Sequence, residues 1–200
     1  MFPELLRRKL AGILELTAAQ IQAMEAHYQL MARWNRVLNL TAVDSQEEAV
    51  ERHYCESLFL AAHLPPGPLR IADVGSGAGL PGIPVAIARP DCSVTLIESH
   101  QRKAVFLREA TRGLPNVEVR AERAEEVAEH FECAVSRAVS YKDLVPVLWK
   151  LADSAELLTG AEAPPADLGF QWRQPIPLPW GKNRFLRISV SRETDNRSFT

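Results

Sequence analysis

The stretch Ile71-Ala-Asp-Val-Gly-Ser-Gly-Ala-Gly-Leu-Pro-Gly82 decides the fold of this chain. The apolar run Leu69–Val74 predicts a buried strand, and Ile83–Ala88 after the glycines is typical of a helix. A glycine-rich turn between a strand and a helix presents bare backbone N–H groups to a nucleotide-like ligand. Glycine suits this turn because it adopts backbone angles that other residues avoid and leaves no side chain between ligand and backbone.

The glycines can be read with two spacings, and each indicates a different ligand. Gly75, Gly77 and Gly79 form G-x-G-x-G. With Asp73 two residues before the first glycine, this pattern resembles the S-adenosylmethionine turn of Rossmann-like methyltransferases. Gly77, Gly79 and Gly82 instead match the G-x-G-x-x-G of dinucleotide-binding folds, although that pattern starts further beyond the strand. We favour the first interpretation and keep an NAD-dependent oxidoreductase as an alternative.

A second acid supports a ligand site at this turn. Ser93–Ile97 predicts the next strand, and Glu98 follows it directly. An acid about 20 residues after a glycine turn, at the tip of the second strand, is placed to accept hydrogen bonds from a ribose. A solvated charge at the strand end is the structural alternative for Glu98.

Beyond the turn, strand-like and helix-like segments alternate, which is typical of a mostly parallel α/β sheet with helices on both faces. We expect helices over 101–112, 123–130 and 141–152, and strands over 116–120, 133–136 and 155–159. Residues 161–179 are expected to be irregular, and 185–190 to form a final edge strand.

The first 64 residues predict a helical cap. A helix is expected over 5–14, and the capping box at Thr17 starts a second helix that ends near Asn39-Leu-Thr41. Another capping box at Ser45 starts a helix that runs to about His63. We therefore expect one domain over 1–200, with the cap at 1–64 and a Rossmann-like core at 65–200.

Composition narrows the class of protein further. The net charge of −2 does not indicate nucleic acid by itself, although a local basic surface is enough to bind phosphates. The basic residues of 166–200 are interpreted as a solvated face. Cys55, Cys92 and Cys133 are scattered without a C-x-x-C pair, which predicts buried thiols in a reducing cytoplasm and no metal site. Because no apolar run is long enough to span a bilayer, we expect a cytoplasmic protein without membrane contact, and a monomer by default.

Several further motifs lie in a fixed order between about residues 17 and 150. They are Trp34-Asn35, Asn39-Leu-Thr41, Arg52-His53, the glycine turn through Pro81-Gly82, Phe106-Leu-Arg108, Arg123-Ala-Glu125 and Ser136-Arg-Ala138. Together they resemble the guanine-N7 methyltransferases of bacterial small-subunit (16S) ribosomal RNA, formerly called glucose-inhibited division protein B. The resemblance implies a class I, Rossmann-like methyltransferase that transfers a methyl group from S-adenosylmethionine to N7 of a guanine in this RNA.

The resemblance also assigns roles to individual residues. Gly75 and Leu80 would line the S-adenosylmethionine site, within the turn formed with Asp73, Gly77 and Gly79. The other cofactor contacts are implied as Glu98 to the ribose, and Ala124 and Glu125 to the adenine. Glu125 has a surface helix charge as its structural alternative.

On the substrate side, Arg137 would sit at the catalytic mouth, near both cofactor and RNA. Arg52 and His53 would face the RNA from the cap. The structural alternatives are an ion-paired or solvated Arg52 and a His53 that is satisfied within its helix. The implied partner is ribosomal RNA or the small ribosomal subunit.

Three positions depart from the family pattern. Glu98 and Glu56 stand where the family has Asp, and Thr159-Gly160 stands where it has Lys-Gly. Residues 151–200 match weakly. A ribosome- or RNA-binding relative without catalytic activity therefore remains an alternative.

Overall fold

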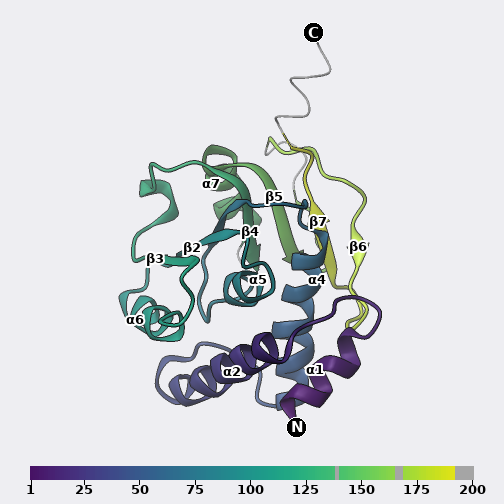
Figure 1. Cartoon of the computed structure of the whole chain (residues 1–200). Helices are drawn as coiled ribbons and strands as arrows, with labels where there is room; N and C mark the ends of the chain where they lie inside the picture. The colour runs from purple at the N-terminus through teal and green to yellow at the C-terminus, as the bar shows by residue number, and fades with distance from the viewer. Residues whose placement is uncertain (138–139, 165–168, 192–200) are drawn as a thin grey trace.

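The computed structural model describes residues 1–137, 140–164 and 169–191. Within these residues a seven-stranded sheet has the order β3-β2-β1-β4-β5-β7-β6 (Figure 1). Its strands are β1 (Arg70–Val74), β2 (Ser93–Ile97), β3 (Val117–Arg120), β4 (Phe131–Arg137), β5 (Ala152–Thr159), β6 (Ile176–Pro177) and β7 (Phe185–Ile188). Strands β1 to β5 pair in parallel, whereas β7 is antiparallel to both β5 and β6. The predicted α/β class with a mostly parallel sheet is confirmed.

Helices precede the sheet and connect its strands. They are α1 (Phe2–Leu10), α2 (Ala18–Leu38), α3 (Gln46–Ala49), the π-helix η1 (Val50–Cys55), α4 (Glu56–His63), α5 (Gly82–Ala88), α6 (Gln101–Ala110), the 3₁₀-helix η2 (Ala124–Glu126) and α7 (Tyr141–Leu151). Strand order reverses between β1 and β4, which are neighbours in the sheet. In open α/β sheets, ligands bind beyond the carboxyl ends of the strands at such a switch point.

The two faces of the sheet are covered unequally. Ile71 of β1 belongs to a large core with residues of α1, α2, α4, α5 and α6, whereas Ala72 and Val74 belong to a smaller core with α7. Helix α2 contacts α5 and α6, and α4 contacts α5 and β5 (Figure 1). The N-terminal helices therefore share one hydrophobic core with the sheet.

The helix expected from Ser45 to His63 forms, but not as one α-helix. Its middle, Val50–Cys55, is π-helical, and the N–H of Glu56 bonds the carbonyl of Glu51 five residues earlier. Residue propensities do not distinguish an i+5 turn from an i+4 turn, so the sequence carried no signal for it. Such π turns are frequent at functional sites, and this one contains Arg52 and His53.

Other elements differ from the expectation as well. The first helix spans Phe2–Leu10 instead of 5–14. The segment 123–130 forms only a single 3₁₀ turn, and β5 begins at Ala152, directly after α7. Strand β7 is not at the edge, because β6 pairs outside it within a segment expected to be irregular. Pro177 of β6 is compatible with this outermost position, since an edge strand tolerates the missing N–H donor.

All three cysteines are buried and free. Burial raises the pKa of the Cys55 thiol to about 12 and that of Cys133 still further, so both remain protonated at neutral pH. Among the described residues, no helix combines the length and the low polarity needed to cross a bilayer.

Candidate functional site

The glycine turn connects β1 to α5 with three left-handed residues. The φ angles are 73° at Gly75, 55° at Gly77 and 79° at Gly79, a region that residues with a Cβ rarely adopt. At Gly79 an added Cβ would also collide with Cδ1 of Ile83. Gly79 and Leu80 are buried, while Gly75 is exposed at the tip of the turn.

Asp73 braces this turn from inside the protein. Its carboxylate is buried, and Oδ2 accepts a hydrogen bond from the N–H of Gly82 at 2.9 Å. Burial raises the pKa of Asp73 to about 7, although the hydrogen bond from the Gly82 N–H acts to lower it. The second oxygen, Oδ1, is buried and has no hydrogen-bond partner among the described residues. An added Cβ at Gly82 would lie 2.5 Å from Asp73 Oδ2, so Gly82 is a packing glycine.

Glu98 closes the turn from the end of β2. Its Oε2 accepts from the N–H of Gly77 at 2.9 Å, and its Oε1 accepts from the N–H of His100 at 2.8 Å. Each carboxylate oxygen has about two acceptor sites, so one site on each remains for a ligand. The fixed carboxylate can thus accept two hydroxyl groups without giving up either backbone contact.

A cavity of about 290 Å³ opens beyond the carboxyl ends of β1, β2 and β3. We call it the acidic cavity; its lining residues include Gly75, Glu98, Ala124, Glu125, Asp143 and Leu144. Four of the predicted cofactor residues therefore meet at one place: Gly75, Glu98, Ala124 and Glu125. Asp143, which enters from α7, was not among the residues that the sequence singled out.

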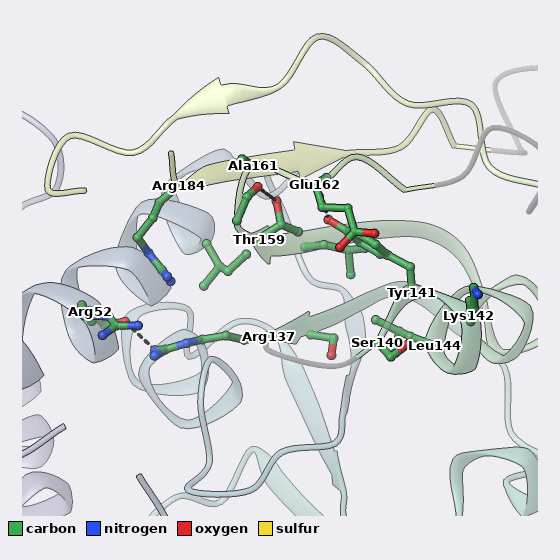
Figure 2. A pocket seen from close by; sticks show the side chains of 14 residues that line it. Arg52, Arg137, Ser140, Tyr141, Lys142, Leu144, Thr159, Ala161, Glu162 and Arg184 are labelled. Carbon is green, nitrogen blue, oxygen red and sulfur yellow. Dashed lines mark hydrogen bonds between the residues drawn. The ribbon is translucent and has the colours of Figure 1, made fainter. Parts of the chain in front are cut away.

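A second cavity, of about 600 Å³, lies beyond the ends of β4 and β5 (Figure 2). We call it the arginine cavity; its lining residues include Arg52, Arg137, Leu144, Thr159, Glu162 and Arg184. Leu144 lines both cavities, so they adjoin along the carboxyl edge of the sheet. One ligand can therefore occupy the acidic cavity while a second approaches from the arginine cavity.

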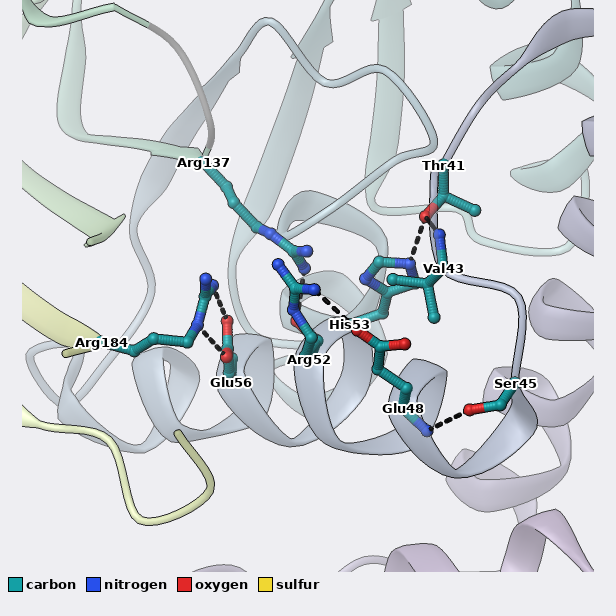
Figure 3. A network of polar contacts seen from close by, with 9 residues as sticks. All are labelled: Thr41, Val43, Ser45, Glu48, Arg52, His53, Glu56, Arg137 and Arg184. Carbon is teal, nitrogen blue, oxygen red and sulfur yellow. Dashed lines mark hydrogen bonds and ion pairs between the residues drawn. The ribbon is translucent and has the colours of Figure 1, made fainter. Parts of the chain in front are cut away.

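Arg137 is held in the arginine cavity by a neutral partner. Its guanidinium donates a hydrogen bond to the main-chain carbonyl of Arg52 (Figure 3). Among the described residues, no carboxylate forms an ion pair with Arg137. Burial lowers the pKa of Arg137 to about 10, against the effect of the nearby Glu56 carboxylate and together with the charges of Arg184 and Arg52. Arg137 therefore stays charged at neutral pH.

The other two arginines of this cavity are paired with acids. Arg52 contacts Glu48 at 2.7 Å, and Arg184 holds both oxygens of Glu56 at 2.5 and 2.6 Å (Figure 3). Glu56 is fully buried. Its position in the apolar helix α4 was a usable signal, since a buried carboxylate requires a partner. The sequence alone could not say which cation it was.

The interpretation of the C-terminal basic residues as a solvated face is wrong for Arg184 and Arg187. Arg187 is only 7% exposed, and its Nε donates to Oγ1 of Thr159 at 3.1 Å. Arg184 brings a guanidinium to the cavity that Thr159 lines, where the family pattern has a lysine. Arg192 and Arg197 lie outside the described residues.

The sequence predicted that His53 faces the RNA. In the structure His53 is buried instead. Its ring is 2% exposed, and Nε2 shares a hydrogen bond of 2.7 Å with Oγ1 of Thr41. Burial lowers its pKa to about 3, and the charges of Arg137 and Arg52 act in the same direction. The ring is therefore neutral at neutral pH. Arg52 alone of this pair lines the cavity.

The sheet order and the glycine turn after β1 define a Rossmann-like α/β domain. A solved S-adenosylmethionine-dependent methyltransferase from Aquifex aeolicus has the same fold, with a TM-score of 0.59 and 15% identity. The match covers 80% of this chain and 97% of that one. At this level of identity the likeness concerns the fold alone.

The chain belongs to the family of rRNA small subunit methyltransferase G, whose family model matches residues 20–158. Proteins named ribosomal RNA small subunit methyltransferase G are similar to it. The protein from Chromobacterium violaceum is 44% identical over 131 residues, covering 64% of this chain and 62% of the relative. The protein from Nitrosospira multiformis is 47% identical over 131 residues, covering 64% and 60%. The matches span about three fifths of the length of these relatives, and Arg184 lies outside the family match.

Proposed function

We propose that this protein transfers a methyl group from S-adenosylmethionine to N7 of a guanine in 16S ribosomal RNA. The observation that carries the proposal is the pair of adjoining cavities, one acidic and one lined by arginines, in a chain of this family. A cofactor and an RNA segment need different chemistry, and the two cavities supply it side by side. Family membership also favours this activity over the NAD-dependent oxidoreductase alternative.

The acidic cavity fits a nucleoside with a positively charged sulfonium. The free acceptor sites of Glu98 suit the two ribose hydroxyls, and Ala124 and Glu125 lie where an adenine would follow. Gly75 has no side chain, so its backbone is accessible to a ligand in this cavity. Acids outnumber cations in the lining of this cavity, which favours a cationic ligand: Glu98, Glu122, Glu125 and Asp143 stand against Arg123.

The arginine cavity fits RNA. Guanidinium groups match phosphate oxygens in geometry and charge. Arg52 and Arg184 each have a carboxylate partner, whereas Arg137 has none among the described residues, so its charge is available to a phosphate. Lys142 also lines this cavity and brings a second cation to it. RNA bases are usually read in loops and unpaired segments, so the substrate is expected to present its guanine outside a helix.

The reaction needs little from the protein beyond positioning. Bound S-adenosylmethionine supplies an electrophilic methyl group. Guanine N7 carries an exposed lone pair and no proton, so no side chain has to act as a general base. Arg137 and Arg52 would orient the nucleotide, while the glycine turn and Glu98 fix the donor. Such alignment can contribute about 7–11 kcal/mol to lowering the barrier.

The decisive experiment is transfer of labelled methyl from S-adenosylmethionine to small ribosomal subunits from cells that lack this methyltransferase. Chemical cleavage at N7-methylguanine maps the product. Label at a single guanine is the expected result. Tight cofactor binding without any label would favour the alternative of a non-catalytic ribosome-binding relative, and saturable NAD binding in place of S-adenosylmethionine would contradict the proposal.

A further inference from the structure

Four sequence motifs meet beside the arginine cavity: Trp34-Asn35, Asn39-Leu-Thr41, Arg52-His53 and Ser136-Arg137. In the structure, hydrogen bonds connect Asn35 to Thr41, Thr41 to His53, and Arg137 to Arg52, which is the chain neighbour of His53. We propose that Asn35, Thr41, His53 and the carbonyl of Arg52 form a cap relay that positions the Arg137 guanidinium. The inference rests on the proposed function only in taking Arg137 as a substrate-orienting group.

The relay begins with Asn35, one turn before the end of α2. Its Nδ2 donates to the carbonyl of Thr41, and its Oδ1 accepts from the N–H of Thr41, both at 2.9 Å. An amide side chain can do both at once because it carries a donor and an acceptor. The reciprocal pair fixes the backbone of the irregular α2–α3 loop at one residue. Thr41 is thereby held in one orientation.

Thr41 then fixes the buried ring of His53. Its Oγ1 accepts from the N–H of Val43 at 3.1 Å and shares the 2.7 Å hydrogen bond with His53 Nε2 (Figure 3). No described residue is a partner for His53 Nδ1. The Thr41 hydroxyl is therefore the side-chain contact that orients the His53 ring.

His53 fixes the carbonyl that Arg137 uses. It directly follows Arg52 in the π-helical turn, so holding its ring holds the peptide group between the two residues. The side chain of Ser57 adds a hydrogen bond to the His53 carbonyl, which pins the same turn from the other side. The Arg52 carbonyl accepts from the Arg137 guanidinium. The relay thus connects the end of α2 to the end of β4.

A carbonyl acceptor has a consequence that a carboxylate would not have. Arg184 is positioned by Glu56, and that carboxylate cancels its charge. The relay positions Arg137 with a neutral group, so that no carboxylate of the described residues is bonded to its guanidinium. This arrangement combines a fixed position with donor groups that remain open to an anionic substrate.

The test is the substitution Thr41→Val, which removes the hydroxyl at nearly constant volume. We expect kcat for methyl transfer to fall about 10-fold or more, since small misplacements of catalytic groups are that costly, with KM for S-adenosylmethionine unchanged. Thr41→Ser keeps the hydroxyl and should restore most of the rate. Thr111→Val is the control, because it removes a threonine hydroxyl outside the relay: Thr111 is buried and its hydroxyl donates one hydrogen bond, to the carbonyl of Leu107 at 2.8 Å.

The relay acts through Arg137, so the effect must depend on that residue. In an Arg137→Ala background, Thr41→Val should lower kcat no further. An equal fold-loss in both backgrounds would overturn the relay, as would equal losses for Thr41→Val and Thr111→Val.

A second readout does not need the proposed function. In ¹⁵N NMR the guanidinium of Arg137, identified by its absence in Arg137→Ala, should exchange slowly in the wild type and faster in Thr41→Val. Unchanged exchange would contradict the relay. If the wild type exchanges slowly and Thr41→Val exchanges faster, but the wild type methylates no RNA, the relay is retained and the proposed function is rejected.

Discussion

The acidic cavity and the arginine cavity adjoin, but they are built in different ways. The wall of the acidic cavity at the turn comes from residues close in sequence: Asp73 bonds Gly82, and Glu98 bonds Gly77 and His100. In the arginine cavity, the Arg137 contact to Arg52 spans 85 residues, and the Arg184 pair with Glu56 spans 128. The glycine turn that forms one wall of the acidic cavity is therefore braced within one stretch of chain, whereas the arginine contacts exist only when the whole domain is folded.

This difference predicts which substitutions affect stability and which affect binding. Long-range pairs in the arginine cavity contribute to the tertiary structure, so breaking them should weaken the fold. The turn is braced locally, so its surface residues can be changed with effects confined to the cofactor.

The largest expected effect is that of Arg184→Ala. It leaves Glu56 buried without its cation, and breaking such a pair costs about 3–5 kcal/mol in the free energy of unfolding. Urea denaturation measures the change. Arg70→Ala is the control, because its partner Glu132 is exposed (side chains 50% and 43%) and such pairs contribute less than about 1 kcal/mol. Equal losses for the two variants would remove the distinction between the long-range and the exposed pair.

An effect of similar size is expected from Asp73→Asn, and it depends on pH. The pKa of Asp73 is about 7 in the folded protein, against an ordinary value of 3.8. Between these values the folded state holds a proton that the unfolded state has released, so wild-type stability falls as pH rises. The variant lacks this loss, on the order of 1.4 kcal/mol for each unit of pKa difference. Its stability relative to the wild type should therefore increase from about pH 4 to about pH 7.

Asp91→Asn is the control for the pH measurement. An exposed ion pair with Arg89 lowers the pKa of Asp91, so its contribution to stability has the opposite sign and is small. Parallel stability curves for Asp73→Asn and the wild type would show that Asp73 does not titrate in this range.

The same contrast explains how much the sequence could predict. The turn follows from glycine spacing and from an acid at a fixed distance, which are short-range signals, and Gly75, Glu98, Ala124 and Glu125 indeed meet in one cavity. Arg184 could not be found in this way, because nothing local distinguishes it from a solvated arginine. Its partner Glu56 and the π turn at Arg52 are likewise outcomes of tertiary packing.

Gly75→Val tests the local construction of the acidic cavity. A branched side chain is strained at the φ angle of 73°. It would also project from a residue that lines the cavity and so occupy space that the cofactor needs. We expect the affinity for S-adenosylmethionine to fall at least about 100-fold. The backbone strain costs a few kcal/mol, and the new side chain keeps the cofactor away from the backbone of the turn. Gly12→Val is the control: its φ is 78°, but an added Cβ meets nothing within 4 Å. Calorimetric titration should show normal affinity for the control variant.

Arg137→Ala should leave cofactor affinity intact and lower methyl transfer about 10- to 100-fold, because a hydrogen bond to a charged group contributes about 1.5–3 kcal/mol. Single-turnover transfer to small subunits measures it. Lys150→Ala is the control: it removes an exposed cation of α7 that does not line the cavity, and it should be neutral. If both variants transfer methyl at the wild-type rate, Arg137 has no catalytic role.

The smallest effect is expected for Glu98→Gln. This substitution, compared with Glu98→Asp, distinguishes the negative charge of the Glu98 carboxylate from the length of its side chain. Glutamine keeps one oxygen acceptor, but its NH₂ group must face the N–H of either Gly77 or His100, so one backbone contact is lost. Together with the lost charge, this should weaken S-adenosylmethionine binding about 10-fold. Glu98→Asp keeps the charge and shortens the side chain by one methylene to the residue that the family pattern has. If Asp binds the cofactor better than Gln, the charge is what the ribose requires, and the shorter arm is accommodated by the turn. If Gln binds better, the reach to both backbone N–H groups matters more, and the glutamate of this chain is matched to its own turn.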